Sequence, residues 1–235
     1  MRNFEGYLNE RGLNINEYKN IQPLPGWITN QIKKSKPKFI LDFGCGYGQT
    51  ILSIKKQFPE IKVFGHDIDK ESKKVCKNKN IDFFNRIQDI PNNYFDMVLS
   101  MHVFEHVDDN QINLIFEQLK RILKHNGFLL IAVPNAQSLT GVYWLFEDHT
   151  HLRLYTANSL LRLLRFNNFS NVKLLDRYAT EGHGIFFKVL RLISLKIVEF
   201  LKILVNKLTS NNYHMKGFKV FTYEVKAMGV NIKEP

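Results

Sequence analysis

Short apolar runs alternate with amphipathic stretches from residue 38 onward. Continuous apolar runs are typical of buried strands, and apolar residues spaced three and four apart are typical of helices. Asp69 stands where the cap of a helix belongs. Such alternation predicts an α/β domain, in which helices cover both faces of a parallel sheet. The expected strands are residues 39–43, 61–66, 81–84, 95–100 and 128–133, and the expected helices are residues 50–57, 69–79 and 109–123.

The two ends of the chain depart from this alternation. Residues 1 to about 36 are polar and interrupted by Pro23, Pro25 and Gly26, which predicts a leader with one or two short helices. We therefore divide the chain into an N-terminal helical leader, residues 1–37, and a domain, residues 38–235, with a helical insertion at about 182–214. Around this insertion we expect a helix from Thr156 to about residue 166, and strands at residues 172–175 and 220–228.

The insertion contains a long amphipathic stretch, residues 185–208. Its charged and amide side chains fall within about half of a helical wheel, and leucines and isoleucines lie opposite. Because Leu192, Leu195 and Ile203 intrude on the polar side, we expect this helix to pack against its own domain, over an acceptor pocket or across a dimer interface. The alternative is an anionic membrane surface, which suits a wide apolar face with lysines at its rim.

Composition adds limits to this picture. The chain has 235 residues with 44% apolar content, which suits one globular domain. A net charge of +11 favours an anionic partner, although a lysine-rich composition also gives a merely solvated basic surface. Two cysteines, Cys45 and Cys76, are too few for a disulfide framework and indicate a reducing compartment. Without a secretory pattern or a bilayer-length apolar run, we expect a cytoplasmic protein, soluble or peripheral to a membrane.

Candidate chemistry begins at the turn after the first expected strand. Gly44, Gly46 and Gly48 stand at alternate positions between a strand and a helix, where a nucleotide-type ligand can approach bare backbone. The spacing G-x-G-x-G differs from the dinucleotide fingerprint G-x-G-x-x-G. Asp42 precedes the first glycine by two positions, and a carboxylate there would attract a cationic ligand but repel a pyrophosphate. At the end of the second strand, Asp67 can accept hydrogen bonds from both ribose hydroxyls.

Three segments in this order, LDFGCGYG, GHDID and DIPNNYFDMVLSMHVFEHV, resemble the class I S-adenosylmethionine-dependent methyltransferases over about residues 38–135. The resemblance implies a Rossmann-like, doubly wound sheet, mostly parallel with an antiparallel C-terminal strand, and S-adenosylmethionine as the cofactor. It places the three glycines and Cys45 at the methionine part of the cofactor and Asp42 at its polar end. Asp67 would hold the ribose, Ile68 would lie against the adenine, and Met101 is a further expected cofactor contact.

The adenine contact departs from the family pattern. Arg86 stands where the family often has a carboxylate for the adenine amino group. Backbone groups of Arg86 and Ile87, or the nearby Asp89, would serve instead.

His102 and His106 follow the fourth strand, whose carboxyl end opens onto the ligand-binding crevice of such sheets. Transfer to a hydroxyl needs a base for its proton, so both are candidate catalytic residues. The alternative is that His106 only braces the following loop. A metal is a further alternative, since His102, Glu105 and His106 stand at i, i+3 and i+4. The segment is similar to that of quinone-type O-methyltransferases, some of which use a metal, but His102 replaces the expected carboxylate, and we assign no metal ligand.

A second histidine pair lies in residues 147–156, which resemble the D-H-x-H-x-R-x-[YF]-[TS] stretch of methyltransferases from polysaccharide and quinone pathways. In those enzymes this loop covers the acceptor. Polar side chains packed this densely are costly to bury without partners, which favours a polar pocket. His149 and His151 are therefore rival bases, and solvated loop histidines are the alternative.

The leading hypothesis is O-methylation of a small-molecule, sugar or lipid-linked acceptor. RNA methylation is an alternative suggested only by the positive charge, and the sequence has neither an Asn-Pro-Pro-Tyr-type motif nor a cysteine in a suitable loop. A protein that binds the cofactor without catalysis is another alternative. The glycine spacing argues against a nicotinamide-dependent oxidoreductase.

Overall fold

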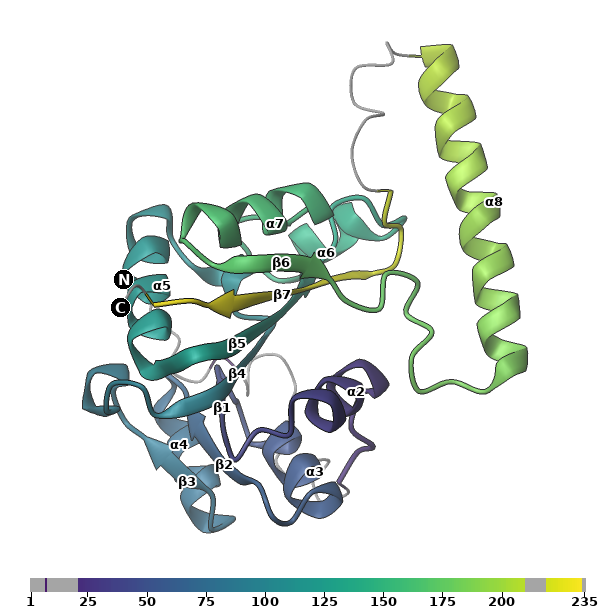
Figure 1. The fold of residues 1–235 in the computed structure, drawn as a ribbon. Helices are drawn as coiled ribbons and strands as arrows, with labels where there is room; N and C mark the ends of the chain where they lie inside the picture. Colours follow the sequence, from purple (N-terminus) through teal and green to yellow (C-terminus); the bar gives the residue numbers. More distant parts are fainter. Residues whose placement is uncertain (1–6, 8–20, 210–218, 234–235) are drawn as a thin grey trace.

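A seven-stranded sheet with helices on both faces forms the body of the protein (Figure 1). The computed structural model describes residue 7, residues 21–209 and residues 219–233. The strand order is β3-β2-β1-β4-β5-β7-β6. The strands are β1 (Phe39–Phe43), β2 (Lys62–His66), β3 (Asp82–Phe84), β4 (Phe95–Met101), β5 (Leu123–Pro134), β6 (Ser170–Leu174) and β7 (Glu224–Asn231).

Strands β1 to β5 pair in parallel, and β7 runs antiparallel to both β5 and β6. The predicted fold class, a mostly parallel doubly wound sheet with an antiparallel C-terminal strand, is confirmed. The helices between these strands are α3 (Gln49–Gln57), α4 (Lys70–Asn78), α5 (Asp109–Ile122), α6 (Gly141–Glu147) and α7 (Ala157–Phe166), with short 3-10 turns η2 (Ile87–Asp89) and η3 (Phe104–His106).

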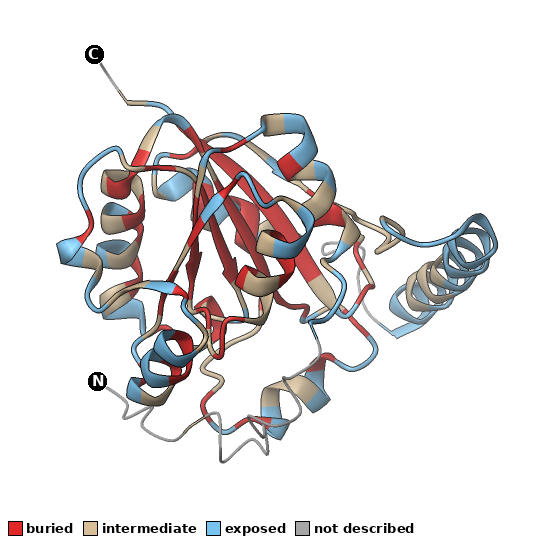
Figure 2. Cartoon of the chain, turned by 90° about the horizontal axis from the view of Figure 1, so that it is seen from below, coloured by how far each residue is buried: buried red, intermediate tan, exposed pale blue. Residues whose placement is uncertain are grey.

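Alternate residues of the central strands point into two separate cores. Leu41 and Val98 pack with α5 and α7 on one face, whereas Ile40 and Leu99 pack with α3 and α4 on the other. Figure 2 shows this arrangement as buried strands between two layers of helices. Burial on both faces explains why these strands are continuous apolar runs in the sequence.

Two predicted helix caps are confirmed. The Asp69 carboxylate accepts a hydrogen bond from the Ser72 N–H at 2.9 Å, at the start of α4. Thr156 accepts one from the Ser159 N–H at 3.1 Å, and Ser159 bonds back in a capping box.

Some elements differ from the prediction. Strand β5 begins at Leu123, not residue 128, because Leu123 already pairs with Phe95 and Gly127 pairs with Asn231. These pairings use the main chain and so do not require apolar side chains. Helix α6 covers residues for which no element was predicted. Strand β7 extends to Asn231, beyond the predicted end at residue 228.

Part of the predicted leader belongs to the core. Helix α2 (Gly26–Ser35) follows the expected prolines, and it buries Trp27, Ile28 and Ile32 against the α3 side of the sheet. The first part of the leader, apart from Tyr7, lies outside the described residues.

The amphipathic stretch forms one long helix, α8 (Ile185–Thr209), that projects from the sheet domain (Figure 1). The expected burial of this helix against its own domain is wrong, since none of its residues is buried. Leu195, Val198 and Ile203 are half-covered, but Phe186 and Phe200 remain 71% and 64% exposed. Among the described helices, none combines the length and apolar character needed to cross a bilayer.

Candidate functional site

Three glycines shape the turn between β1 and α3. Gly44, Gly46 and Gly48 have φ of 78°, 49° and 76°, a left-handed conformation that costs other residues free energy. The N–H groups of Gly44 and Cys45 donate to the His66 carbonyl, at 2.7 and 3.1 Å. The turn is thereby fixed to the end of β2.

Two of these glycines also lack space for a side chain. A Cβ on Gly44 would lie 2.2 Å from Cγ2 of Val103, and a Cβ on Gly48 would lie 2.5 Å from Cδ1 of Ile81. Val103 belongs to the segment that carries His102 and His106. The glycine turn and this segment are therefore in direct contact.

Asp67 connects the glycine turn to the end of β2. Its Oδ2 accepts a hydrogen bond from the Gly46 N–H at 2.8 Å, and its Oδ1 accepts one from the Asp69 N–H at 2.9 Å. Burial raises the pKa of Asp67, and these two hydrogen bonds oppose the rise. Each carboxylate oxygen has a second lone pair, so Asp67 can still accept a ligand hydroxyl.

Asp42 is buried at the end of β1, with 2% of its surface exposed. Burial and, secondarily, the charge of Asp67 raise the pKa of Asp42 to about 7. No described residue donates a hydrogen bond to its carboxylate. A cationic ligand group would favour the ionised form of Asp42.

Cys45 and Cys76 meet beneath the glycine turn, which the sequence did not indicate. Their Sγ atoms lie 4.0 Å apart, and each lies 3.6 Å from the Gly46 carbonyl. Both cysteines are free thiols. The hydrogen bond to Cys76, together with burial, raises the pKa of Cys45, so Cys45 remains a thiol under the turn.

The remaining residues expected at the cofactor lie at or just after the ends of β2, β3 and β4. Ile68 is 68% exposed next to Asp67. Arg86 forms an exposed ion pair with Asp89 at 2.7 Å, just before Ile87 begins η2. Met101 ends β4 and is half-buried. Asp89 is therefore occupied by Arg86 in the ligand-free protein.

His102 is held by two carboxylates. Its Nε2 lies 2.7 Å from Glu224 on β7, and its Nδ1 lies 3.3 Å from Glu105. Burial lowers the pKa of His102, but these two carboxylates outweigh that effect and raise it to about 10. A histidine with this pKa is already protonated at neutral pH and is a poor proton acceptor.

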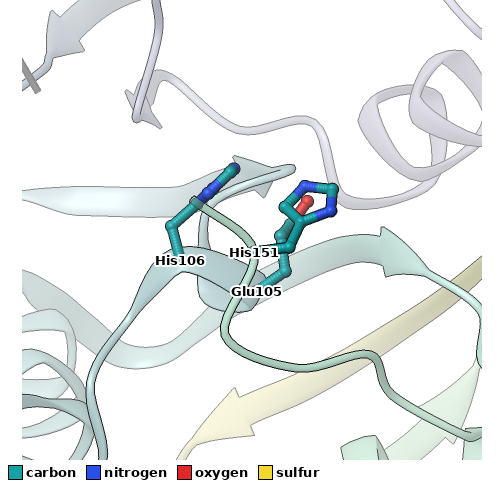
Figure 3. A group of neighbouring side chains, drawn as sticks. All are labelled: Glu105, His106 and His151. Atoms are coloured by element: carbon teal, nitrogen blue, oxygen red, sulfur yellow. The ribbon is translucent and has the colours of Figure 1, made fainter. Parts of the chain in front are cut away.

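His106 and His151 lie together, with ring centroids 4.7 Å apart (Figure 3). His106 comes from η3, and His151 comes from the loop between α6 and α7. The Leu152 N–H donates to the Glu105 carbonyl at 2.8 Å, and this bond holds the loop against η3. Burial lowers the pKa of His106. His149 is exposed and lies outside this pair.

Sequence reasoning missed the residues that orient the pair. The Thr150 hydroxyl lies 2.9 Å from His106 Nδ1 and donates to Asp148 at 2.6 Å. The Tyr7 hydroxyl donates to the other Asp148 oxygen at 2.5 Å, which brings Tyr7 to the site. Burial would raise the pKa of Asp148, but these hydrogen bonds lower it to about 2. The only sequence feature that could have indicated these orienting residues was the high density of polar side chains in residues 147–156.

Solved structures share this fold. A SAM-dependent methyltransferase from Archaeoglobus fulgidus matches with a TM-score of 0.59 and 18% identity, over 86% of this chain and 92% of that one. A SAM-dependent methyltransferase from Thermotoga maritima, described as a possible histamine N-methyltransferase, matches at 0.61 and 16%, over 97% of both chains. Phosphoethanolamine N-methyltransferase 2 of Haemonchus contortus, solved with S-adenosyl-L-methionine, matches at 0.60 and 16%, over 99% of this chain and 61% of that one.

The sequence itself also matches a family. No curated protein matches it. A family model described as a methyltransferase domain matches residues 19–174, which is more than half of the chain and includes the glycine turn, Asp67 and the His106–His151 pair. The chain therefore belongs to the methyltransferase-domain family and is an S-adenosylmethionine-dependent methyltransferase.

Proposed function

We propose that the protein transfers the methyl group of S-adenosylmethionine to a hydroxyl group of a small-molecule, sugar or lipid-linked acceptor. One observation carries the proposal: the glycine turn touches Val103, in the segment that leads to the His106–His151 pair. A methyl donor on the turn and an acceptor on the pair would then be neighbours. Proximity of this kind is the main requirement of an in-line displacement.

On the cofactor side, the main chain of Gly44, Cys45, Gly46 and Gly48 would surround the methionine part. Asp42 would attract its amino group, because the ionised form of this buried acid needs a cation. Asp67 would accept the ribose hydroxyls. The adenine would lie over the exposed Ile68, near the main chain of Arg86 and Ile87, and Met101 would contact the cofactor from the end of β4.

On the acceptor side, we assign the base to His106 or His151. A base must have an unprotonated nitrogen near the acceptor hydroxyl. His106 Nδ1 faces Thr150, which already donates its proton to Asp148, so the imidazole proton belongs on Nδ1 and Nε2 has the lone pair. His102, with its two carboxylates, would instead position the segment. His149 remains a weaker candidate.

Labelled methyl transfer tests this function. The purified protein would be incubated with methyl-labelled S-adenosylmethionine and with separate pools of small molecules, lipid-linked glycans and RNA. We expect the labelled methyl group in the small-molecule or lipid-linked pool and not in RNA. The labelled product should be an ether, which resists alkaline hydrolysis, whereas a methyl ester would release the labelled methyl group in alkali. His106→Gln or His151→Gln should lower turnover while S-adenosylhomocysteine affinity stays within about twofold. Label in RNA would support the alternative acceptor, and cofactor binding without any labelled product would indicate a non-catalytic binding protein.

Helix α8 supports a membrane-bound acceptor. The residues of one continuous arc on its surface are apolar and exposed, and Lys196 and Lys207 lie along one edge of the arc. The helix has five basic residues against one acidic residue, a complement to anionic headgroups. We propose that this arc lies on an anionic bilayer. Its members are Phe186, Leu190, Ile193, Ile197, Phe200, Leu201, Leu204 and Leu208.

Co-sedimentation with vesicles tests this contact. The full chain should pellet with phosphatidylglycerol vesicles at low salt and less so with phosphatidylcholine vesicles. Ile197→Glu should reduce the pellet by at least about fivefold, whereas Asn206→Glu adds the same charge away from the apolar arc and should have a smaller effect. A pellet no larger than in the lipid-free control would overturn the membrane contact. A dimer that forms without lipid and is broken by Ile197→Glu would identify a second copy as the partner instead.

A further inference from the structure

Three side chains at the proposed acceptor site have potential metal-ligand atoms close to one another. Glu105 and His106 come from η3, His151 comes from the loop before α7, and one ligand atom of each lies within 4.8 Å of the others (Figure 3). We infer that these three residues bind a divalent transition-metal ion such as zinc, cobalt, iron(II) or manganese. The inference rests on the methyl-transfer site proposed above and assigns its histidines a different role: their lone pairs would bind the ion, and the ion, in place of a histidine base, would activate the acceptor hydroxyl.

The hydrogen bonds of the two imidazoles leave the lone pair of each ring on Nε2. His151 Nδ1 lies 2.5 Å from the Trp144 carbonyl, which can only accept, so this nitrogen has the proton and Nε2 has the lone pair. The bond from His106 Nδ1 to Thr150 has the same consequence. Metal-binding histidines are held in this way, with the second ring nitrogen bonded to a carbonyl or hydroxyl.

Glu105 provides an independent argument. Its side chain has no exposed surface, and within the described part of the chain neither carboxylate oxygen accepts a hydrogen bond. Among the described residues, its one ion-pair partner is His102, whose Nδ1 lies 3.3 Å from Oε1 and which makes its shorter contact with Glu224. Burial of a carboxylate without full compensation is costly. A metal ion among Glu105, His106 and His151 would compensate this charge.

The donor set selects the class of metal. Two neutral imidazoles and one carboxylate suit a first-row transition ion, while magnesium and calcium prefer oxygen ligands. Asp148 and Thr150 would hold the outer side of His106. This ligand set differs from the metal site considered as an alternative in the sequence, which consisted of His102, Glu105 and His106. In the structure His102 pairs with Glu224, and His151 is the third ligand instead.

Three protein ligands leave room in the coordination sphere for an acceptor hydroxyl. The ion would lower the pKa of this hydroxyl, whose proton would pass to water. The alkoxide oxygen would then form a bond to the methyl carbon as the sulfur–methyl bond breaks. Neutral S-adenosylhomocysteine and the methyl ether are the products, and no group changes oxidation state.

A cobalt titration tests the site. The full chain would be freed of metal with a chelator and titrated with Co²⁺ alone, with visible d–d absorption as the readout. We expect one ion per chain, displaced by Zn²⁺. His151→Ala and Glu105→Gln should each weaken binding at least about 100-fold, whereas His149→Ala, in the same loop but outside the cluster, should bind normally.

Circular dichroism and S-adenosylhomocysteine calorimetry on the same samples separate the possible failures. If one of the two variants, His151→Ala or Glu105→Gln, does not fold, Co²⁺ binding by the other variant tests the metal site. The metal site would be overturned if the wild type did not bind Co²⁺, or if folded His151→Ala bound Co²⁺ as well as the wild type does. Either result would count even if S-adenosylhomocysteine binds. Failure of S-adenosylhomocysteine to bind would overturn the proposed function, and the Co²⁺ result would then stand on its own.

Discussion

Gly44 and Val103 are packed so closely that a Cβ on residue 44 would lie 2.2 Å from Cγ2 of Val103. Gly44 belongs to the turn assigned to the cofactor, and Val103 belongs to the segment that positions Glu105 and His106. A displacement of either segment therefore moves the other. Methyl transfer needs this coupling, since small errors of alignment between donor and acceptor cost rate.

Gly44→Ala should damage both stability and cofactor binding. The left-handed backbone costs alanine about 1–2 kcal/mol, and the overlap with Val103 adds about 1–3 kcal/mol. We expect a lower urea midpoint and at least about tenfold weaker S-adenosylhomocysteine binding. Adding Val103→Ala should restore part of the stability, because it removes the overlapping methyl group.

Gly184→Ala is the matched control for this substitution. No atom lies within 4 Å of a Cβ at Gly184, so this variant should unfold like the wild type. Equal stability of the Gly44→Ala and Gly184→Ala proteins would contradict the packing described for the glycine turn.

Cofactor affinity should depend on pH through Asp42. Its pKa is raised from 3.8 to about 7 in the folded protein, and binding of an amino group requires the ionised form. Affinity for S-adenosylhomocysteine should therefore rise about tenfold per pH unit on approaching pH 7 from below, and level off above it. Calorimetry across this range measures the slope, and Asp42→Asn should flatten it. A wild-type slope that persists in Asp42→Asn would assign the dependence to another group.

The same shift predicts a stability effect of opposite sign. The folded state keeps the Asp42 proton up to about pH 7, whereas the unfolded chain releases it near 3.8. The contribution of Asp42 to stability is therefore lost as pH rises through this interval. Without ligand, Asp42→Asn should gain stability relative to wild type between pH 5 and pH 8 in urea unfolding, and a relative loss over that interval would contradict the assignment.

A buried ion pair holds the segment before α8 to the sheet. Lys226 Nζ lies 3.2 Å from Asp176, and both side chains are almost fully buried. Lys226→Ala would leave the Asp176 carboxylate without this cation, so the free energy of unfolding should fall by about 3 kcal/mol. Lys196→Ala removes a partner from the exposed pair with Glu199, and it should cost less than about 1 kcal/mol. Similar losses in both variants would contradict the buried role of Lys226.

The order of strands and helices was predictable because it depends on local patterns. The apolar runs of β1 and β4 reflect burial on both faces, and Asp69 and Thr156 cap helices within one turn. The start of β5 was not predictable, since the pairing of Leu123 with Phe95 uses the main chain. The exposure of α8 was also missed, because an amphipathic pattern does not specify what covers its apolar face.

The candidate site also has parts that local sequence patterns predict and parts that only tertiary contacts determine. The glycine turn and Asp67 are separate sequence signals, and their hydrogen bond joins neighbouring strand ends. His151 lies beside His106 because the Leu152 N–H donates a hydrogen bond to the Glu105 carbonyl, and these two segments are far apart in the sequence. Tyr7 and Cys76 reach the site in the same way, through tertiary contacts without a local pattern.

The account depends most on Asp67 and the glycine turn as the place where the cofactor binds. Calorimetric titration of S-adenosylhomocysteine into the wild type, Asp67→Ala and Asp82→Ala tests this directly. Asp82 is an exposed carboxylate on the neighbouring β3 and serves as the control. We predict one saturable site in the wild type and in Asp82→Ala, with at least about tenfold weaker binding in Asp67→Ala. No binding by the wild type, or equal affinity in wild type and Asp67→Ala, would contradict the account.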